Sequence, residues 1–190
     1  MVGFPSPGGP WPAIRRDLDR PNRRSVVAVV AYIGKDASTV MPLRTGDVLV
    51  CDASDAAIKG RLTSVAALKT FRRRGVQLFS LEGLHAKVVA TPTSAWVGSA
   101  NASNNSENEL VEAAVRVAGQ QARALRSWAT SLATEDSEIN ATELNRLGGL
   151  RLSPPRPGPR RTVPPQALPS TSDESGTAES YGSSTIEELS

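Results

Sequence analysis

Continuous runs of apolar residues, many of them β-branched, mark the first predicted strands. One run covers residues 25–33 and a second covers residues 47–51. A strand with one face in solvent alternates apolar and polar residues, whereas a strand buried on both faces is apolar nearly throughout. The pattern therefore predicts a sheet that is covered on both faces.

A helical segment is predicted to connect the second strand to a third. Apolar residues recur at helical spacing within residues 63–74, Thr63 or Ser64 can cap the start, and Gly75 can end the helix. Residues 76–81 then form another apolar run. Strand, helix and strand in this order predict a βαβ unit, whose two strands are parallel.

A β-hairpin is predicted to follow the βαβ unit. Residues 84–90 and 95–100 are its strands, and residues 91–94 are its turn. Successive side chains of a strand point to opposite faces of the sheet, so His85 and Lys87 project from the same face. An imidazole and an ammonium group side by side suit a site that holds a negatively charged ligand.

The pattern after the hairpin predicts one more strand and two helices. The strand covers residues 109–117, and the helices cover residues 120–132 and 142–147. Trp96 and Trp128 are predicted to be core aromatics. The buried face of the longer helix is predicted to carry Ala124, Leu125, Trp128 and Leu132. The predicted fold class is α/β, a mixed and largely buried sheet flanked by helices.

Proline content divides the chain into three parts. Residues 1–24 contain five prolines and residues 151–190 contain seven, but residues 25–150 contain two. Proline lacks a backbone N–H, and the tail also has little apolar surface to bury. We therefore predict one domain at residues 25–150, between a disordered basic arm and a disordered Pro/Ser-rich tail.

The positive charge of the chain is concentrated in the predicted arm. The net charge is +3, and residues 1–24 hold five arginines against two aspartates. Arg15-Arg16 and Arg23-Arg24 could contact phosphates, or the arm could be a solvated lead-in to the domain. The sequence leaves both interpretations open.

The composition excludes two classes of site and indicates a compartment. The chain has one histidine, His85, and one cysteine, Cys51, so structural zinc sites and disulfide frameworks are excluded. The longest apolar run is far shorter than the roughly 20 residues of a membrane helix, and residues 1–9 lack the apolar core of a signal peptide. We expect a cytoplasmic protein without stable membrane insertion, and a lone cysteine agrees with a reducing compartment.

The hairpin also carries the residues best suited to chemistry. An imidazole such as His85 can act as a nucleophile or a proton donor, and Lys87 can neutralise a phosphate oxygen. Gly98 allows a close backbone approach, and Ser99 and Asn101 can donate hydrogen bonds to non-bridging oxygens. These residue types in this order predict a phosphate-binding site.

The pattern His85-x-Lys87 followed by Gly98-Ser99-x-Asn101 resembles the HKD motif of the phospholipase D superfamily. The likeness extends over residues 25–132 and implies a phospholipase-D-like fold. It further implies phosphodiester chemistry through a phosphohistidine on His85, with Lys87, Ser99 and Asn101 holding the phosphate. By the same resemblance no metal and no cofactor is needed.

An acid that orients the histidine is expected on the strand after the hairpin. Glu107, Glu109 and Glu112 are the candidates. The surroundings of Glu107 resemble the small bacterial nucleases, whereas the apolar residues around Glu112 resemble the corresponding strand of the family. We choose Glu112 as the catalytic acid.

The chain departs from the family pattern in two ways. Pro92 stands seven residues after His85, where the family usually has an aspartate, and the chain has one motif where active members combine two. Because one histidine attacks and another protonates the leaving group, a chain with one motif needs a second copy across a two-fold axis. The chain is therefore expected to form a homodimer.

These expectations lead to one hypothesis and two alternatives. The hypothesis is a metal-independent, nuclease-like phosphodiesterase that acts on DNA or RNA in a site shared by two chains. One alternative is a catalytically inactive module that binds phosphate or nucleic acid. The other is a phospholipase D that acts on phospholipids.

Overall fold

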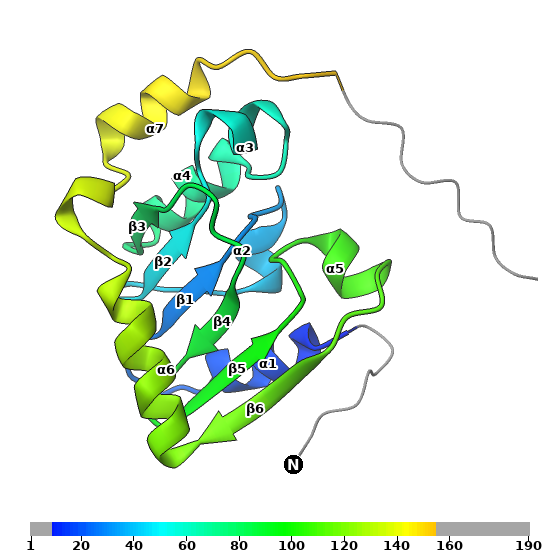
Figure 1. Cartoon of the computed structure of the whole chain (residues 1–190), viewed down its shortest axis with the longest axis vertical. Coiled ribbons are helices and arrows are strands. Elements are labelled where there is room, and N and C mark those ends of the chain that lie inside the picture. Colours follow the sequence, from blue (N-terminus) through cyan, green and yellow to red (C-terminus); the bar gives the residue numbers. More distant parts are fainter. Residues whose placement is uncertain (1–8, 155–190) are drawn as a thin grey trace, which may run out of the picture. The chain divides into compact units, whose positions relative to one another are not determined.

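The computed structural model describes residues 9–154, in which six strands form one mixed sheet. The strands lie side by side in the order β3-β2-β1-β4-β5-β6 (Figure 1). They are β1 (Val27–Val30), β2 (Val48–Cys51), β3 (Gln77–Ser80), β4 (Lys87–Ala90), β5 (Ser94–Gly98) and β6 (Ala114–Ala118). The helices are α1 (Trp11–Leu18), α2 (Ala37–Val40), α3 (Asp55–Lys59), α4 (Val65–Arg73), α5 (Asn104–Asn108), α6 (Gly119–Ser131), the 3-10 helix η1 (Glu135–Ser137) and α7 (Ala141–Gly148).

The strand pairing confirms the predicted α/β class. β1, β2 and β3 are parallel neighbours, and β4, β5 and β6 continue the sheet in antiparallel pairs. The predicted helix between the second and third strands is α4, whose N-cap Ser64 accepts a hydrogen bond from the backbone N–H of Ala67. The predicted βαβ unit and the hairpin are thus both present.

Both faces of the sheet are covered. One face packs against α1, α2, α4 and α7, and Trp11, Phe71 and Leu147 from these helices join its core. On the other face, α6 contributes Ala122 and Ala129 to a second core around Val29 and Val88. This two-sided burial explains why the strands are apolar nearly throughout. In residues 9–154 no helix has the length and apolar character needed to span a membrane.

The buried face of α6 agrees with the prediction in part, since Leu125 and Leu132 pack against the second core. Ala122 and Ala129 are fully buried, but Ala124 is exposed and Trp128 is 41% exposed. Alanine allows the helix to approach the sheet closely, so the helix is rotated toward its small residues and Trp128 faces solvent. Trp96, in contrast, packs against the core as predicted.

The segment before the last strand also differs from the prediction. Residues 109–113 do not join the sheet, and β6 begins at Ala114. The short helix α5 precedes this segment, and its N-cap Ser103 accepts a hydrogen bond from the backbone N–H of Ser106. The apolar residues Leu110 and Val111, which favoured a strand in the sequence, are 55% and 94% exposed.

The N-terminal segment is folded from Gly9 onward, so the prediction of a disordered arm is wrong for residues 9–24. Helix α1 buries Trp11, Ile14 and Leu18 against the sheet. Proline in the first turn of a helix is favourable, because that position needs no N–H donor and its fixed φ suits the helix. The proline content of this segment therefore led to a prediction of disorder where the chain forms helix α1. Residues 1–8 and the predicted tail from residue 155 lie outside the described residues.

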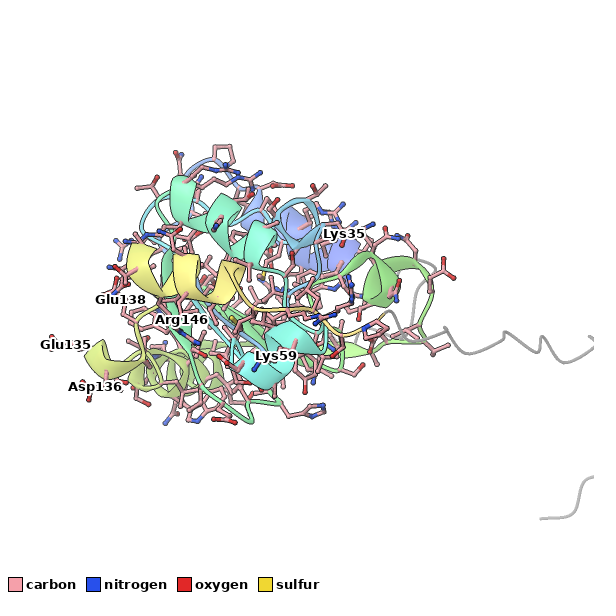
Figure 2. All side chains as sticks on the ribbon, turned by 90° about the horizontal axis from the view of Figure 1, so that it is seen from above. Lys35, Lys59, Glu135, Asp136, Glu138 and Arg146 are labelled. Carbon is pink, nitrogen blue, oxygen red and sulfur yellow. The ribbon has the colours of Figure 1, made fainter. Side chains whose placement is uncertain are left out.

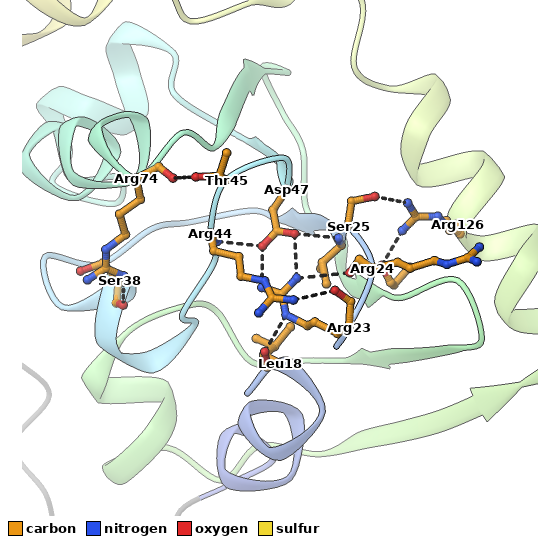
Figure 3. Close-up of polar contacts among 12 residues, drawn as sticks. Leu18, Arg23, Arg24, Ser25, Ser38, Arg44, Thr45, Asp47, Arg74 and Arg126 are labelled. Atoms are coloured by element: carbon orange, nitrogen blue, oxygen red, sulfur yellow. Dashed lines mark hydrogen bonds and ion pairs between the residues drawn. The ribbon is translucent and has the colours of Figure 1, made fainter. Parts of the chain in front are cut away.

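A buried ion pair ties the segment before β1 to the start of β2 (Figure 3). Asp47 is fully buried, and its two carboxylate oxygens accept hydrogen bonds from the Arg23 guanidinium at 2.8 and 2.6 Å. The backbone N–H groups of Val26 and Arg44 also donate to this carboxylate, each at 2.8 Å. Arg15 likewise pairs with Glu107. Arg23 and Arg15 are therefore structural residues rather than free phosphate contacts.

Candidate active site

The sequence-predicted site residues gather at one edge of the sheet. Antiparallel pairing places Val30, at the end of β1, opposite Lys87, at the start of β4. It also places Gly98, at the end of β5, opposite Ala114, at the start of β6. Residues just before β4, just after β5 and just before β6 therefore lie at the same edge, which we call the catalytic edge.

His85 lies on this edge with its side chain exposed. Its ring meets the Tyr32 ring edge-on, with 6.4 Å between the centroids. Within the described residues the imidazole makes no hydrogen bond. The backbone on either side is fixed, because the N–H of Leu84 donates to the C=O of Leu81 at 3.2 Å and the N–H of Ala31 donates to the C=O of Ala86 at 3.0 Å. An exposed imidazole on a fixed backbone is accessible to an incoming phosphate.

Lys87 supplies a positive charge beside His85. Its Nζ donates a hydrogen bond to the backbone C=O of His85 at 2.7 Å. Burial lowers the pKa of Lys87 below its ordinary value, and the negative charge of Glu112 opposes that shift. The ammonium group is therefore partly desolvated and close to the acid, where its attraction for an anion is stronger than in open water.

Ser99 and Glu112 form a hydrogen-bonded pair. The Ser99 hydroxyl donates to the Glu112 carboxylate and accepts from the backbone N–H of Ala113 at 3.2 Å. Glu112 is 8% exposed. A Cβ on Gly98 would stand 2.3 Å from the C=O of Ala113, so β6 can approach this closely because residue 98 is glycine. In this structure Gly98 serves strand packing.

The three candidate acids have different surroundings. Glu107 is paired with Arg15, Glu109 is exposed, and Glu112 is held by Ser99. Glu112 thus lies at the catalytic edge, but its hydrogen bond goes to Ser99 rather than to His85. In residues 9–154 no group of three or more histidine, cysteine or acidic side chains is placed to hold a metal ion.

Asn101 is bound through its backbone and its side chain. Its Oδ1 accepts from the backbone N–H of Tyr32 at 3.2 Å, and its C=O accepts from the Trp11 indole N–H at 2.9 Å. The amide oxygen is therefore engaged with the end of β1. The NH2 group remains as the side-chain donor that the predicted phosphate contact requires.

Asp52 is a site-supporting residue that the sequence reasoning missed. It is 6% exposed, and its carboxylate accepts from the backbone N–H of Ser54 at 2.9 Å and of Gly83 at 3.1 Å. Gly83 belongs to the loop that leads to His85. The signal was an aspartate directly after the second apolar run, at the end of a strand where polar site residues often lie.

Pro92 lies in the β4–β5 turn, at the opposite edge of the sheet. Thr91 closes this turn, because its hydroxyl oxygen accepts from the backbone N–H of Ser94 at 3.0 Å and its hydroxyl donates to the C=O of Ser94 at 2.9 Å. Thr91 thus makes turn contacts next to the position where the family usually has an aspartate.

The geometry defines an α/β protein with basic, hydroxyl and acidic groups at one edge of a mixed sheet. No family model and no curated protein matches the chain. Among solved structures it is similar to a phospholipase D family member, Nuc from Salmonella typhimurium. The TM-score is 0.57 at 17% identity, over 73% of this chain and 94% of that one. NucT from Helicobacter pylori gives a TM-score of 0.48 at 16% identity, over 67% of this chain and 92% of that one.

The likeness to Nuc shows that the chain has the fold of the phospholipase D superfamily. This confirms the fold that the motif resemblance implied.

Proposed function

We propose that the chain is a nuclease-like phosphodiesterase that needs no metal and acts through a phosphohistidine on His85. The observation that supports this most strongly is the catalytic edge itself. On a phospholipase D fold, His85, Lys87 and the Ser99–Glu112 pair come from three separate segments and meet at one edge. A purely structural role does not require an exposed imidazole next to a partly desolvated ammonium group.

The first step forms a bond between a ring nitrogen of His85 and the phosphorus of a diester. The bond from phosphorus to the leaving oxygen breaks, and that oxygen takes a proton from a second imidazole. Lys87, Ser99 and the Asn101 amide stabilise the charge on the non-bridging oxygens. In the second step, water gives a proton to that second imidazole and its oxygen attacks phosphorus. The bond between phosphorus and the His85 nitrogen breaks, which releases a phosphomonoester and restores His85.

The second imidazole is proposed to be the partner's His85, because each chain has one histidine. The surface next to the site supports a second copy there. Leu110 and Val111 are apolar and largely exposed, and Val111 directly precedes the buried Glu112. A two-fold contact at this patch would cover apolar surface and bring two sites together.

The choice of DNA or RNA as substrate rests on the sequence resemblance to nuclease-like members and on the net charge of +3. The test is cleavage of plasmid and of labelled single-stranded DNA in EDTA. Wild-type protein is expected to cleave, and His85→Ala is expected to lose the activity. Glu135→Gln, in η1 and outside the site, serves as the control that keeps it. Activity that needs Mg²⁺ or survives in His85→Ala would overturn the proposal.

Trapping distinguishes the chemistry from other hydrolytic routes. Acid-labile, alkali-stable radiolabel on His85, after reaction with DNA labelled at its internal phosphodiesters, would identify the phosphohistidine. A second candidate, an inactive nucleic-acid-binding module, is favoured by Pro92 in place of the family's aspartate. Salt-sensitive binding that persists in His85→Ala, without cleavage by the wild type, would support that candidate. Hydrolysis of phospholipid vesicles instead of DNA would support the third.

A further inference from the structure

The edge of the sheet opposite His85 carries five arginines around two neighbouring hollows, and one of them, Arg23, is paired with Asp47. The first hollow, of about 410 Å³, is lined by residues that include Arg20, Arg24 and Pro92. The second, of about 470 Å³, is also lined by Pro92, together with Arg123 and Arg126 of α6. Hydroxyl groups line both hollows and belong to Thr91, Thr93, Ser94, Ser127, Thr130 and Ser131. We call Arg20, Arg24, Arg123 and Arg126 the distal arginine surface.

Most of this positive charge is not neutralised within the described residues. Arg24 and Arg123 are exposed and their guanidinium groups contact no described acid. Arg126 donates to neutral acceptors, the C=O of Ala90 at 3.0 Å and the Ser25 hydroxyl at 3.1 Å. Burial lowers the pKa of Arg126 below its ordinary value, and the charge of Asp47 opposes that shift. A partly buried guanidinium without a carboxylate of its own favours an external anion.

The nearby acids are already engaged. Asp47 is held by Arg23, beside Arg24 and Arg126 in Figure 3. Asp17 is the one acidic residue among the described residues that line the two hollows. Its carboxylate accepts from the Trp96 indole at 2.9 Å and from Arg116 at 2.8 Å, and it pairs with Arg20.

Asp19, the neighbour of Arg20 in the chain, is exposed but lines neither hollow. A group of acidic side chains lies elsewhere on the molecule. Figure 2 shows Glu135, Asp136 and Glu138 together, in and beside η1. This segment follows the end of α6, whereas Arg123 and Arg126 lie earlier in the helix. The charge of the domain is therefore divided between regions, which leaves the distal arginine surface positive.

We propose that the distal arginine surface binds the sugar-phosphate backbone of a nucleic acid chain. Guanidinium groups and hydroxyl donors around a hollow are the partners that phosphate oxygens take in such complexes. The hydroxyls of Thr91, Thr130 and Ser131 already donate to backbone C=O groups, so those of Thr93 and Ser127 are the available hydroxyl donors. An anionic membrane fits less well, because none of the exposed large apolar residues of the described chain lines either hollow.

This inference rests on the proposed function and adds a length requirement for its substrate. Pro92 is seven residues from His85, which spans about 23 Å along an extended strand. Phosphates advance by about 3.4 Å along one strand of a duplex, so at most about seven nucleotides cover that distance, because an extended single strand spaces its phosphates more widely. A dinucleotide can occupy the catalytic edge alone, whereas a long strand can engage both surfaces.

The test is binding of a fluorescent 30-nucleotide DNA to the full chain, measured by anisotropy at several salt concentrations. All proteins carry His85→Ala so that the DNA stays intact. Adding Arg24→Gln and Arg123→Gln is expected to weaken binding about tenfold or more, since each replaced side chain is a charged hydrogen-bond donor. The slope of log affinity against log salt is expected to fall by about 1.4, or about 0.7 for each lost contact with a single strand.

The matched control replaces two exposed arginines elsewhere, Arg73→Gln and Arg151→Gln, and is expected to leave affinity and slope unchanged. Wild-type affinity and slope in the Arg24/Arg123 variant would overturn the inference. The same proteins are also tested for binding to anionic vesicles. If the Arg24/Arg123 variant loses vesicle binding but keeps DNA binding, the inference is likewise overturned. Because no cleavage is measured, a failure of the proposed catalysis does not affect this result, and the two proposals can fail separately.

Discussion

At the scale of residues, the partner of Glu112 decides which role the acid has. Its carboxylate accepts a hydrogen bond from Ser99, and within the described residues none joins it to His85. Under the proposed function, Glu112 is therefore best described as a positioning residue for Ser99. It holds the hydroxyl at the catalytic edge and balances the charge of Lys87.

A double-mutant cycle tests this assignment. Ser99→Ala and Glu112→Gln are each expected to lower the rate of DNA cleavage by about 10²-fold, the scale of losing one donor to a developing oxyanion. The double variant is expected to be no slower than either single variant, because the two residues act as one unit. If the double variant instead loses the product of the two single fold-losses in cleavage rate, and the pH profile of Glu112→Gln changes, the acid acts through His85.

Asp17 predicts a stability that depends on pH. Burial alone would raise the pKa of this carboxyl, but the hydrogen bonds from Arg116 and Trp96 outweigh it and hold the pKa below its ordinary value. Its contribution is therefore complete above the unfolded value of 3.8 and is lost as pH falls through the lower folded value.

Urea unfolding of wild type and Asp17→Asn measures this contribution. At pH 7 and pH 5 the variant is expected to be less stable by about 1–3 kcal/mol, the scale for hydrogen bonds to a charged group. Below about pH 4 the difference is expected to shrink. A difference that stays the same at pH 3 would contradict the assignment.

At the scale of elements, the loop before β4 depends on one buried carboxylate. Asp52 accepts from the backbone N–H groups of Ser54 and Gly83. Asp52→Asn replaces one of these acceptors with an NH2 group. It is expected to reduce the free energy of unfolding by about 1–3 kcal/mol and to speed hydrogen exchange at Gly83. Asp136→Asn, an exposed change, is the control. Unchanged exchange at Gly83 would rule out this role.

The sequence predicted the elements whose burial is two-sided and regular. β1 to β4 and α4 lie within the predicted segments, and β5, α6 and α7 match theirs to within two residues at each end. Long apolar runs and capping residues are local signals. The start of β6 was wrong, since Leu110 and Val111 are apolar without being buried in the single chain. The buried face of α6 was predicted in part: Leu125 and Leu132 pack against the core, but the fully buried Ala122 and Ala129 were missed because alanine carries a weak pattern.

The candidate site was predictable as far as residue types and spacing determine it. His85, Lys87 and Ser99 were named from the motif and Glu112 from its apolar surroundings, and all four lie at one edge. The position of Asp52 after an apolar run was a signal, but its bond to Gly83 and the tie between Trp11 and Asn101 could not be predicted, because they join segments far apart in the chain. Such contacts depend on the tertiary fold rather than on a local pattern.

At the scale of the whole molecule, a site shared by two chains predicts dominant inhibition by an inactive chain. When wild type exchanges with an equal amount of His85→Ala, random pairing leaves about half of the wild-type chains in active dimers. Cleavage per wild-type chain is therefore expected to fall to about half, and further as the variant is added in excess.

The control for this mixing experiment is His85→Ala with Val111→Glu, which places a charge in the proposed contact. This protein is expected to pair poorly and to leave the wild-type activity intact. Unchanged cleavage per wild-type chain in a tenfold excess of His85→Ala would show that one chain is sufficient for activity.

The buried pair between Arg23 and Asp47 also limits how far the protein can be shortened from its N-terminus. The many prolines before residue 25 would suggest residue 25 as the first residue of a shortened fragment. Such a fragment keeps every strand of the described sheet. It would, however, leave the Asp47 carboxylate buried without its cation, a loss of about 3–5 kcal/mol against a typical total of 5–15. Recombinant fragments of this domain should therefore begin before α1.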